Sequence, residues 1–171
     1  MNPRNFKAQA ALEFLTTYGW AFLVILIMIG TLAYFGILSP SKLLPNRCNI
    51  GSEFQCLDYR ITENGASSQI QIRLKNNVGE PIVLPAAPEG LSVGTETATQ
   101  LTCPTTTPSL PVTMKAGDII DFVKGGCANM ATAGLIKGEK AKANVTINYH
   151  SVASGPSYIK TVKGEILTTV T

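Results

Sequence analysis

The sequence contains one long segment that is almost free of charge. Gln9–Leu38 carries a single charged side chain, Glu13, and the stretch Trp20–Ile29 is apolar without interruption. As an α-helix this segment would measure about 45 Å, whereas a bilayer core is crossed by about 20 residues. A helix that is apolar on all sides needs lipid or other protein around it. We therefore expect a transmembrane helix over residues 9–38.

Charges and prolines set the limits of this helix. Arg4 and Lys7 precede it, and by the positive-inside rule they keep the N-terminus in the cytoplasm. Ser39-Pro40-Ser41 ends it, because proline lacks an N–H donor and disfavours helical geometry in the residue before it. The expected order is a leader over residues 1–8, the helix, a connector over residues 39–47 and an extracellular domain over residues 48–171.

The residues at the start of the apolar segment form a processing pattern. In an ordinary secretory signal the cleavage site follows the apolar region. Here Lys7 and Ala8 stand directly before Gln9, and Glu13 and Phe14 follow within the segment. Cleavage between Ala8 and Gln9 would remove a short basic leader and leave the apolar segment on the mature protein. A carboxylate at the edge of a membrane span is costly to bury, which indicates a function for Glu13.

This pattern resembles the class III signal peptide of archaeal type IV pilins, in which a basic residue, a small residue and a glutamine are followed by Glu-Phe. The family often carries serine where this chain has Ala11, a mild departure because both side chains are small. The resemblance covers residues 4–38, and beyond them the chain agrees with the family in architecture rather than in motif. Recognition by the processing peptidase would then involve Arg4, Lys7, Ala8, Gln9, Glu13 and Phe14.

The resemblance implies a structural subunit of a pilus-like filament that serves surface adhesion. A prepilin peptidase would cut the membrane precursor, and an assembly ATPase and a platform protein would drive its polymerisation into a helical homopolymer. By analogy with bacterial relatives, Glu13 would pair with the new amino group at Gln9 of a neighbouring copy. Gly19, Trp20 and Gly30 would join them in assembly, since small residues let helices approach closely.

Two other functions would use the same features. A minor pilin or tip adhesin shares the leader and the helix with a major pilin, so the sequence does not separate these two. An uncleaved, membrane-anchored binding domain would use the same span and the same outward domain. A simple anchor, however, requires neither the spacing between Gln9 and Glu13 nor glycines in its helix.

The rest of the chain has the pattern of antiparallel β-structure. Ile70, Ile72 and Leu74 alternate with polar residues, as do the apolar residues of Ala141–Tyr149. A final strand over Ile159–Val170 should pair with the latter as a hairpin. Shorter strands are expected at Leu57–Thr62, Ile82–Leu84, Gln100–Cys103, Val112–Met114 and Ile119–Val123. The expected fold class is α+β, a long helix followed by an immunoglobulin-like β-sandwich.

The four cysteines all follow the apolar segment. If that region is extracellular, an even number of cysteines indicates two disulfides. Of the three possible connectivities, proximity in the sequence favours Cys48–Cys56 and Cys103–Cys127. Zinc sites prefer close pairs such as C-x-x-C, which are absent from the sequence, so we expect no metal site.

Two segments are candidates for modification. Asn144-Val145-Thr146 is the only glycosylation sequon, and its asparagine falls on the polar face of an alternating strand, where it should be accessible. Pro85–Pro111 is dense in proline and threonine. We interpret it as a long loop connecting strands, with an exposed, O-glycosylated loop as the alternative.

The sequence offers little that would carry catalysis. His150 is the only histidine, and we expect it on the surface at a strand end. Asp118 and Asp121 should cap a turn, and Lys124-Gly125-Gly126 lacks the strand–loop–helix context of a phosphate loop. The net charge is only +3 and the basic residues are scattered, so no nucleic-acid surface is indicated. We expect no enzyme activity, no cofactor and no small-molecule substrate.

The processing pattern predicts that the mature protein begins at Gln9. N-terminal sequencing of native material tests this, and a start at Met1 or near Ser39 would contradict the resemblance to pilins. Ala8→Trp should leave the precursor uncleaved in the membrane, because the peptidase reads a small residue at this position. Asn2→Trp introduces the same bulky residue outside the pattern, so this matched control should be cleaved normally.

Overall fold

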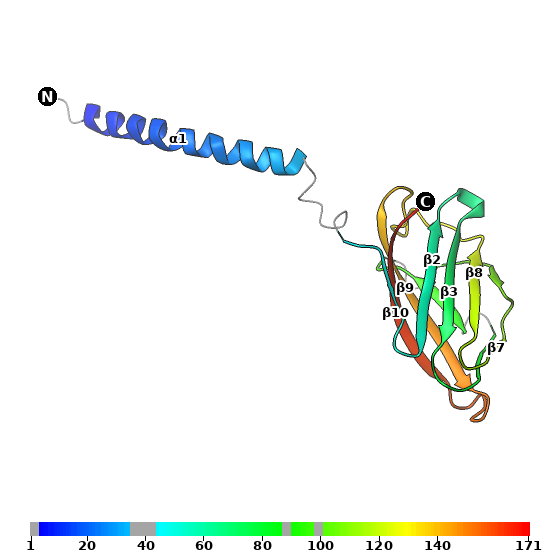
Figure 1. Ribbon diagram of the computed structural model, residues 1–171. Coiled ribbons are helices and arrows are strands. Elements are labelled where there is room, and N and C mark those ends of the chain that lie inside the picture. Colours follow the sequence, from blue (N-terminus) through cyan, green and yellow to red (C-terminus); the bar gives the residue numbers. More distant parts are fainter. Residues whose placement is uncertain (1–3, 35–43, 87–89, 98–100) are drawn as a thin grey trace. The chain divides into compact units, whose positions relative to one another are not determined.

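The computed structural model describes residues 4–34, 44–86, 90–97 and 101–171. The chain divides into two compact units, Met1–Leu44 and Pro45–Thr171, which are considered separately (Figure 1). The first unit contains one helix and the second contains the β-strands. This agrees with the α+β class expected from the sequence.

Helix α1 runs over Arg4–Tyr34. It begins before Gln9, so the expected boundary between leader and helix is not a helix end. Its threonines are compatible with an apolar environment because their hydroxyls donate to carbonyls one turn earlier: Thr17 to Glu13 at 2.8 Å and Thr31 to Met28 at 2.8 Å. The expected helix end at Ser39-Pro40 lies outside the described residues.

The second unit consists of two antiparallel sheets. The larger sheet contains β1 (Arg47–Asn49), β4 (Ile82–Leu84), β5 (Leu91–Gly94), β7 (Val112–Met114), β9 (Lys140–Ser151) and β10 (Lys160–Thr169). Its strand order is β1-β10-β9-β4-β7, and β5 also pairs with β9. The smaller sheet has the order β2-β3-β8-β6. It comprises β2 (Phe54–Thr62), β3 (Gln69–Asn76), β6 (Thr105–Thr107) and β8 (Ile119–Gly125), with the short 3-10 helix η1 (Gly65–Ser67) between β2 and β3.

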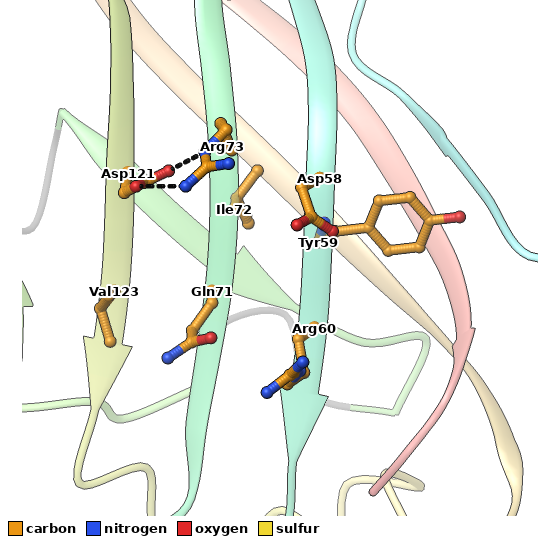
Figure 2. A pocket seen from close by; sticks show the side chains of 8 residues that line it. All are labelled: Asp58, Tyr59, Arg60, Gln71, Ile72, Arg73, Asp121 and Val123. Atoms are coloured by element: carbon orange, nitrogen blue, oxygen red, sulfur yellow. Dashed lines mark hydrogen bonds and ion pairs between the residues drawn. The ribbon is translucent and has the colours of Figure 1, made fainter.

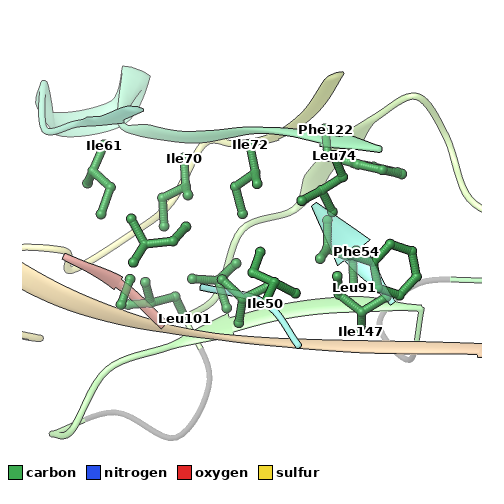
Figure 3. Close-up of a cluster of buried hydrophobic side chains, with 14 of the residues drawn as sticks. Ile50, Phe54, Ile61, Ile70, Ile72, Leu74, Leu91, Leu101, Phe122 and Ile147 are labelled. Atoms are coloured by element: carbon green, nitrogen blue, oxygen red, sulfur yellow. The ribbon is translucent and has the colours of Figure 1, made fainter. Parts of the chain in front are cut away.

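Alternating residues of both sheets form one hydrophobic core. On β3 the buried residues Ile70, Ile72 and Leu74 alternate with more exposed ones, as their spacing predicts. Figure 3 shows these side chains facing residues of the larger sheet such as Ile147. Burial of this shared apolar surface is the main term that holds the two sheets together. The hydrophobic core lies within the second unit, with side chains from both sheets in one buried cluster.

The longest pairing in the domain is the C-terminal hairpin predicted from the sequence. Strands β9 and β10 pair in continuous antiparallel register from Lys160 opposite Tyr149 to Thr169 opposite Lys140. Polar residues on the outer face of β9, from Lys142 to Asn148, are only half-buried, whereas its inward residues are fully buried. This alternation is the reason why the sequence located the hairpin correctly.

The segment Pro85–Pro111 differs from the loop that we expected. It contains two short strands: β5, which pairs with β9, and β6, which pairs with β8. The strand expected at Gln100–Cys103 is wrong for Leu101–Cys103, which have no strand geometry, and Gln100 lies outside the described residues. Leu101 instead donates its N–H to the carbonyl of Val93 at 2.7 Å. The equally short strands expected at Ile82–Leu84 and Val112–Met114 are confirmed as β4 and β7, whereas β5 and β6 lie in a stretch dense in proline and threonine that we interpreted as a loop.

Two disulfides join the pairs that proximity in the sequence favoured. Cys48 lies on β1 and Cys56 on β2, so this bond connects the two sheets. Cys103 lies just before β6 and Cys127 just after β8, so the second bond closes one end of this strand pair. The loops that they close differ in length, with sequence separations of 8 and 24 residues.

Removal of the Cys103–Cys127 disulfide should destabilise the second unit more than removal of the Cys48–Cys56 disulfide. In the chain-entropy description a disulfide stabilises by restricting the unfolded chain, and a longer closed loop gives a larger effect. The double variant Cys103→Ala/Cys127→Ala should therefore lose about 1 kcal/mol more unfolding free energy than Cys48→Ala/Cys56→Ala. Urea unfolding of the two variants measures this difference. A larger loss for the Cys48–Cys56 pair would show that the link between the sheets outweighs loop length.

Candidate functional site

The surface of helix α1 is the first candidate for a functional site. Leu12–Tyr34 is a 23-residue segment that is long and apolar enough to cross a membrane. Its large side chains are exposed, including Phe14 at 63%, Trp20 at 70% and Phe22 at 62%. Such a surface is unstable in water, so in its working state this helix must be covered by lipid or protein.

Three of the residues expected to act in assembly lie along this uncovered surface: Gly19, Trp20 and Gly30. A Cβ placed on Gly19 or Gly30 would meet no atom within 4 Å, so packing within the chain does not require either glycine. They are 11 residues apart, about three helical turns, and therefore share one face of the helix. Trp20 is exposed beside Gly19. A face with two glycines and nothing against it suits close approach by another helix.

Glu13 is the only acidic or basic residue in the candidate span Leu12–Tyr34. Its side chain is exposed, and its carbonyl accepts hydrogen bonds from the hydroxyls of Thr16 and Thr17. Phe14, one residue on, stacks against Tyr18 with ring centroids 4.4 Å apart. The side chains of Arg4, Lys7, Ala8 and Gln9 lie outside the part of the chain whose side chains the structure describes.

A shallow pocket on the outer face of the smaller sheet is the second candidate. It has a volume of about 240 Å³ and is lined by residues of β2, β3 and β8 (Figure 2). Arg73 donates to Asp121 through two parallel bonds, Nε to Oδ1 at 2.6 Å and Nη2 to Oδ2 at 2.8 Å. This hydrogen bonding lowers the pKa of Asp121 and raises that of Arg73.

Both carboxylates of the pocket have hydrogen-bond partners within the protein. Asp121 forms an ion pair with Arg73, and Asp58 accepts a hydrogen bond from the N–H of Tyr59 at 2.8 Å. The expectation that Asp121 caps a turn is therefore wrong. Asp118 does cap one, since it accepts the N–H of Lys115 at 2.8 Å. The partner of Asp121 is set by the register of β3 and β8, which single-strand patterns do not contain.

His150 is buried, contrary to the expectation of a surface residue. Its side chain is only 8% exposed, and its Nδ1 has no hydrogen-bond partner among the described residues. The reason is that β4 pairs with this end of β9 and places Val83 opposite His150. The adjacent Ser151 hydroxyl donates to Glu80 at 2.8 Å. Within the described ranges, no group of three or more His, Cys, Asp or Glu residues is arranged to hold a metal ion.

Asn144, the sequon asparagine, lies in the middle of β9 and is half-buried. Its cross-strand neighbours are Glu165 on β10 and Gly94 on β5. Gly94 has no side chain, so one flank of Asn144 is uncrowded. On the other flank, Glu165 forms ion pairs with both Arg47 and Lys142, so charged side chains lie beside Asn144. Asn144 is thus less accessible than its place in the sequence pattern indicated.

Comparison with known proteins identifies no relative. No protein-family model, no curated protein and no solved structure matches the chain.

Lys124 lies in a position that the sequence pattern did not reveal. It is on β8 two residues after the buried Phe122, and only 6% of its own surface is exposed. Burial lowers the pKa of its ammonium from the ordinary value of 10.5, because a charge is poorly solvated there. No ion-pair partner for Lys124 is found in the described part of the chain. A buried cation of this kind opposes folding.

We therefore expect Lys124→Met to stabilise the protein. Methionine keeps the long unbranched shape without a charge, and the free energy of unfolding should rise by about 1 kcal/mol at pH 7. Because the pKa is lowered in the folded state, the penalty applies below that pKa and fades as the pH rises toward 10.5. Urea unfolding at pH 7 and pH 10 measures both effects. Lys163→Met, at an exposed position on β10, is the control, and an equal gain there would contradict the explanation.

Proposed function

We propose that the chain is the structural subunit of an archaeal type IV pilus-like filament. In this proposal it is made as a membrane precursor, cut between Ala8 and Gln9, and polymerised through its N-terminal helix. The observation that carries the proposal is helix α1, whose apolar side chains from Leu12 to Tyr34 are exposed while a separate unit keeps its own core. The pattern of residues from Lys7 to Phe14 supplies the processing step.

Polymerisation follows from the surface of the helix. A helix this apolar leaves lipid at low cost only if the helices of other copies replace the lipid around it. The face with Gly19 and Gly30 would allow two such helices to approach closely. A contact that joins different surfaces of successive copies without closing produces a helical filament. The partners of the chain are therefore copies of itself, besides the prepilin peptidase, the assembly ATPase and the platform protein.

Glu13 would set the register of these helices. After cleavage, the new N-terminus at Gln9 carries a positive charge one helical turn before the exposed carboxylate of Glu13. In a dry filament core each of these charges needs a partner, because an unpaired buried charge is strongly destabilising. Pairing of Glu13 with Gln9 of a neighbouring copy would satisfy both and favour one axial offset between subunits.

The second unit would form the outward head of the subunit. We assign its two antiparallel sheets to an immunoglobulin-like β-sandwich. Its two disulfides are suited to an oxidising extracellular environment, and Asn144 is the candidate for glycosylation. The precursor would lie in the cell membrane with a cytoplasmic N-terminus, and the mature protein in an extracellular filament that adheres to surfaces.

Electron microscopy of sheared surface material tests the proposal. Filaments that contain the protein would support it, and their absence would favour an uncleaved, membrane-anchored binding domain. The proportion of the protein in purified filaments then separates a major pilin from a minor pilin or tip adhesin, because a minor subunit is present at low abundance.

Glu13→Ala should impair assembly without preventing membrane insertion. Insertion scales place the cost of a central acid at about 2.5–3.5 kcal/mol, so its removal makes insertion easier. Filament yield should nevertheless fall, because the charge at Gln9 loses its partner. Cleavage and filament yield are measured together in the same cells, with Thr17→Ala one turn away as the matched control. Normal filaments would show that Glu13 has no assembly role, and failed cleavage would confine it to peptidase recognition.

A further inference from the structure

One end of the second unit exposes a cluster of hydrophobic side chains. The turn between β9 and β10, Val152–Ile159, is called the tip here. It exposes Tyr158 at 68%, Val152 at 52% and Ile159 at 49%. These are three of the six large hydrophobic residues exposed in the described part of Pro45–Thr171, and the others are Leu57, Ile119 and Ile136. Single exposed apolar residues are normal, but three in one turn indicate an interaction surface.

Backbone hydrogen bonds hold the tip in a defined conformation. Val152 donates its N–H to the carbonyl of Pro81 at 3.0 Å, which fixes the start of the turn to a neighbouring segment. Gly155 donates to Ser151 at 3.0 Å, and Tyr158 donates to Gly155 at 3.3 Å. A turn that is already ordered loses less conformational entropy when a partner covers it.

The opposite end of the same unit contains a hollow. It has a volume of about 470 Å³, within the range of sites that hold small organic groups. Its walls are made largely of small residues, among them Ala66, Gly126, Ala128 and Ala131, and Met130 also lines it. The disulfide between Cys103 and Cys127 fixes one wall.

The tip and the hollow are separated by the length of β10. Lys160, the first residue of β10, directly follows the tip, and β10 extends for ten residues, or about 33 Å. At its far end Thr171 accepts the N–H of Glu63 at 2.9 Å, and Glu63 lines the hollow. Figure 1 shows the turn between β9 and β10 at the end of the domain away from the C-terminus.

The charges beside the two surfaces are complementary. Lys160 is exposed next to the tip, and Glu63 lies at the hollow. Neither side chain forms an ion pair within the described residues. Glu63 accepts only a backbone N–H, that of Gly65, at 3.4 Å.

From these features we infer that the tip of one copy docks into the hollow of the next, with the Tyr158 ring in the hollow and Lys160 beside Glu63. The inference rests on the proposed filament and names a contact between its heads. The two surfaces differ and lie at opposite ends of the unit, so the contact is heterologous, the kind that can repeat along a filament. Aromatic side chains that fill pockets commonly supply most of the energy of such interfaces.

Cross-linking of assembled full-length protein tests the contact. The described cysteines are all in disulfides, so a short bismaleimide reacts with introduced thiols alone. The double variant Ser157→Cys/Ala131→Cys keeps the Tyr158 ring and places a thiol beside it on the exposed tip. It should give a ladder of covalent multimers in denaturing gels, and each single variant should give none. Filaments that form without a ladder would overturn the inference, and this is also the outcome if a saccharide or another protein occupies the hollow. A ladder or dimer from either single variant would show a symmetric contact and overturn it as well.

Charge reversal gives a second, independent measurement. Lys160→Glu and Glu63→Lys should each reduce filament yield about tenfold, the effect of about 1.4 kcal/mol, and the double reversal should restore it. Tyr158→Ala should reduce yield similarly, whereas Ile119→Ala, at an exposed hydrophobic residue on β8, should not. Reversals without effect, or a double variant no better than the singles, would overturn the inference. If the unaltered protein forms no filaments, the proposed function itself fails. If it forms filaments but the variants do not behave as expected, only the docking inference fails.

Discussion

The proposed function depends on one physical constraint, the exposed apolar surface of helix α1. From Leu12 to Tyr34 the helix presents aromatic and aliphatic side chains in all directions and carries one carboxylate. Water disfavours such a surface in proportion to its area. In the proposed function the helix exchanges one apolar surrounding, lipid, for another, the helices of neighbouring copies.

The second unit is built so that this exchange leaves it unaffected. Its hydrophobic cluster draws side chains from both sheets, and both disulfides lie within Pro45–Thr171. A domain with a core of its own keeps its structure while the helix changes environment. Under the proposed function, the division of the chain into two units separates the helix, which passes from lipid into the filament, from the domain that faces outward.

Patterns that repeat over many residues were predicted correctly, and features that depend on contacts between distant segments were not. The alternation through Ala141–Tyr149 located the hairpin because ten paired residues gave a clear period of two. The proximity of the cysteines gave their pairing. By contrast, β5 and β6 lie in a stretch dense in proline and threonine, whose composition is that of a loop. The burial of His150 follows from β4 beside it, and the partner of Asp121 follows from the register with β3. The pattern of a single strand contains neither of these two relations.

The position of the Cys48–Cys56 bond has a mechanical consequence. The chain enters the second unit at Pro45, and its first strand, β1, is held to β10 through only three residues. A pulling force on the preceding segment would break the hydrogen bonds of so short a strand one residue at a time. With Cys48 bonded to Cys56 on β2, the force passes after Arg47 into a covalent link to the other sheet. Tension is then shared by both layers of the domain, as a subunit that carries load along its chain requires.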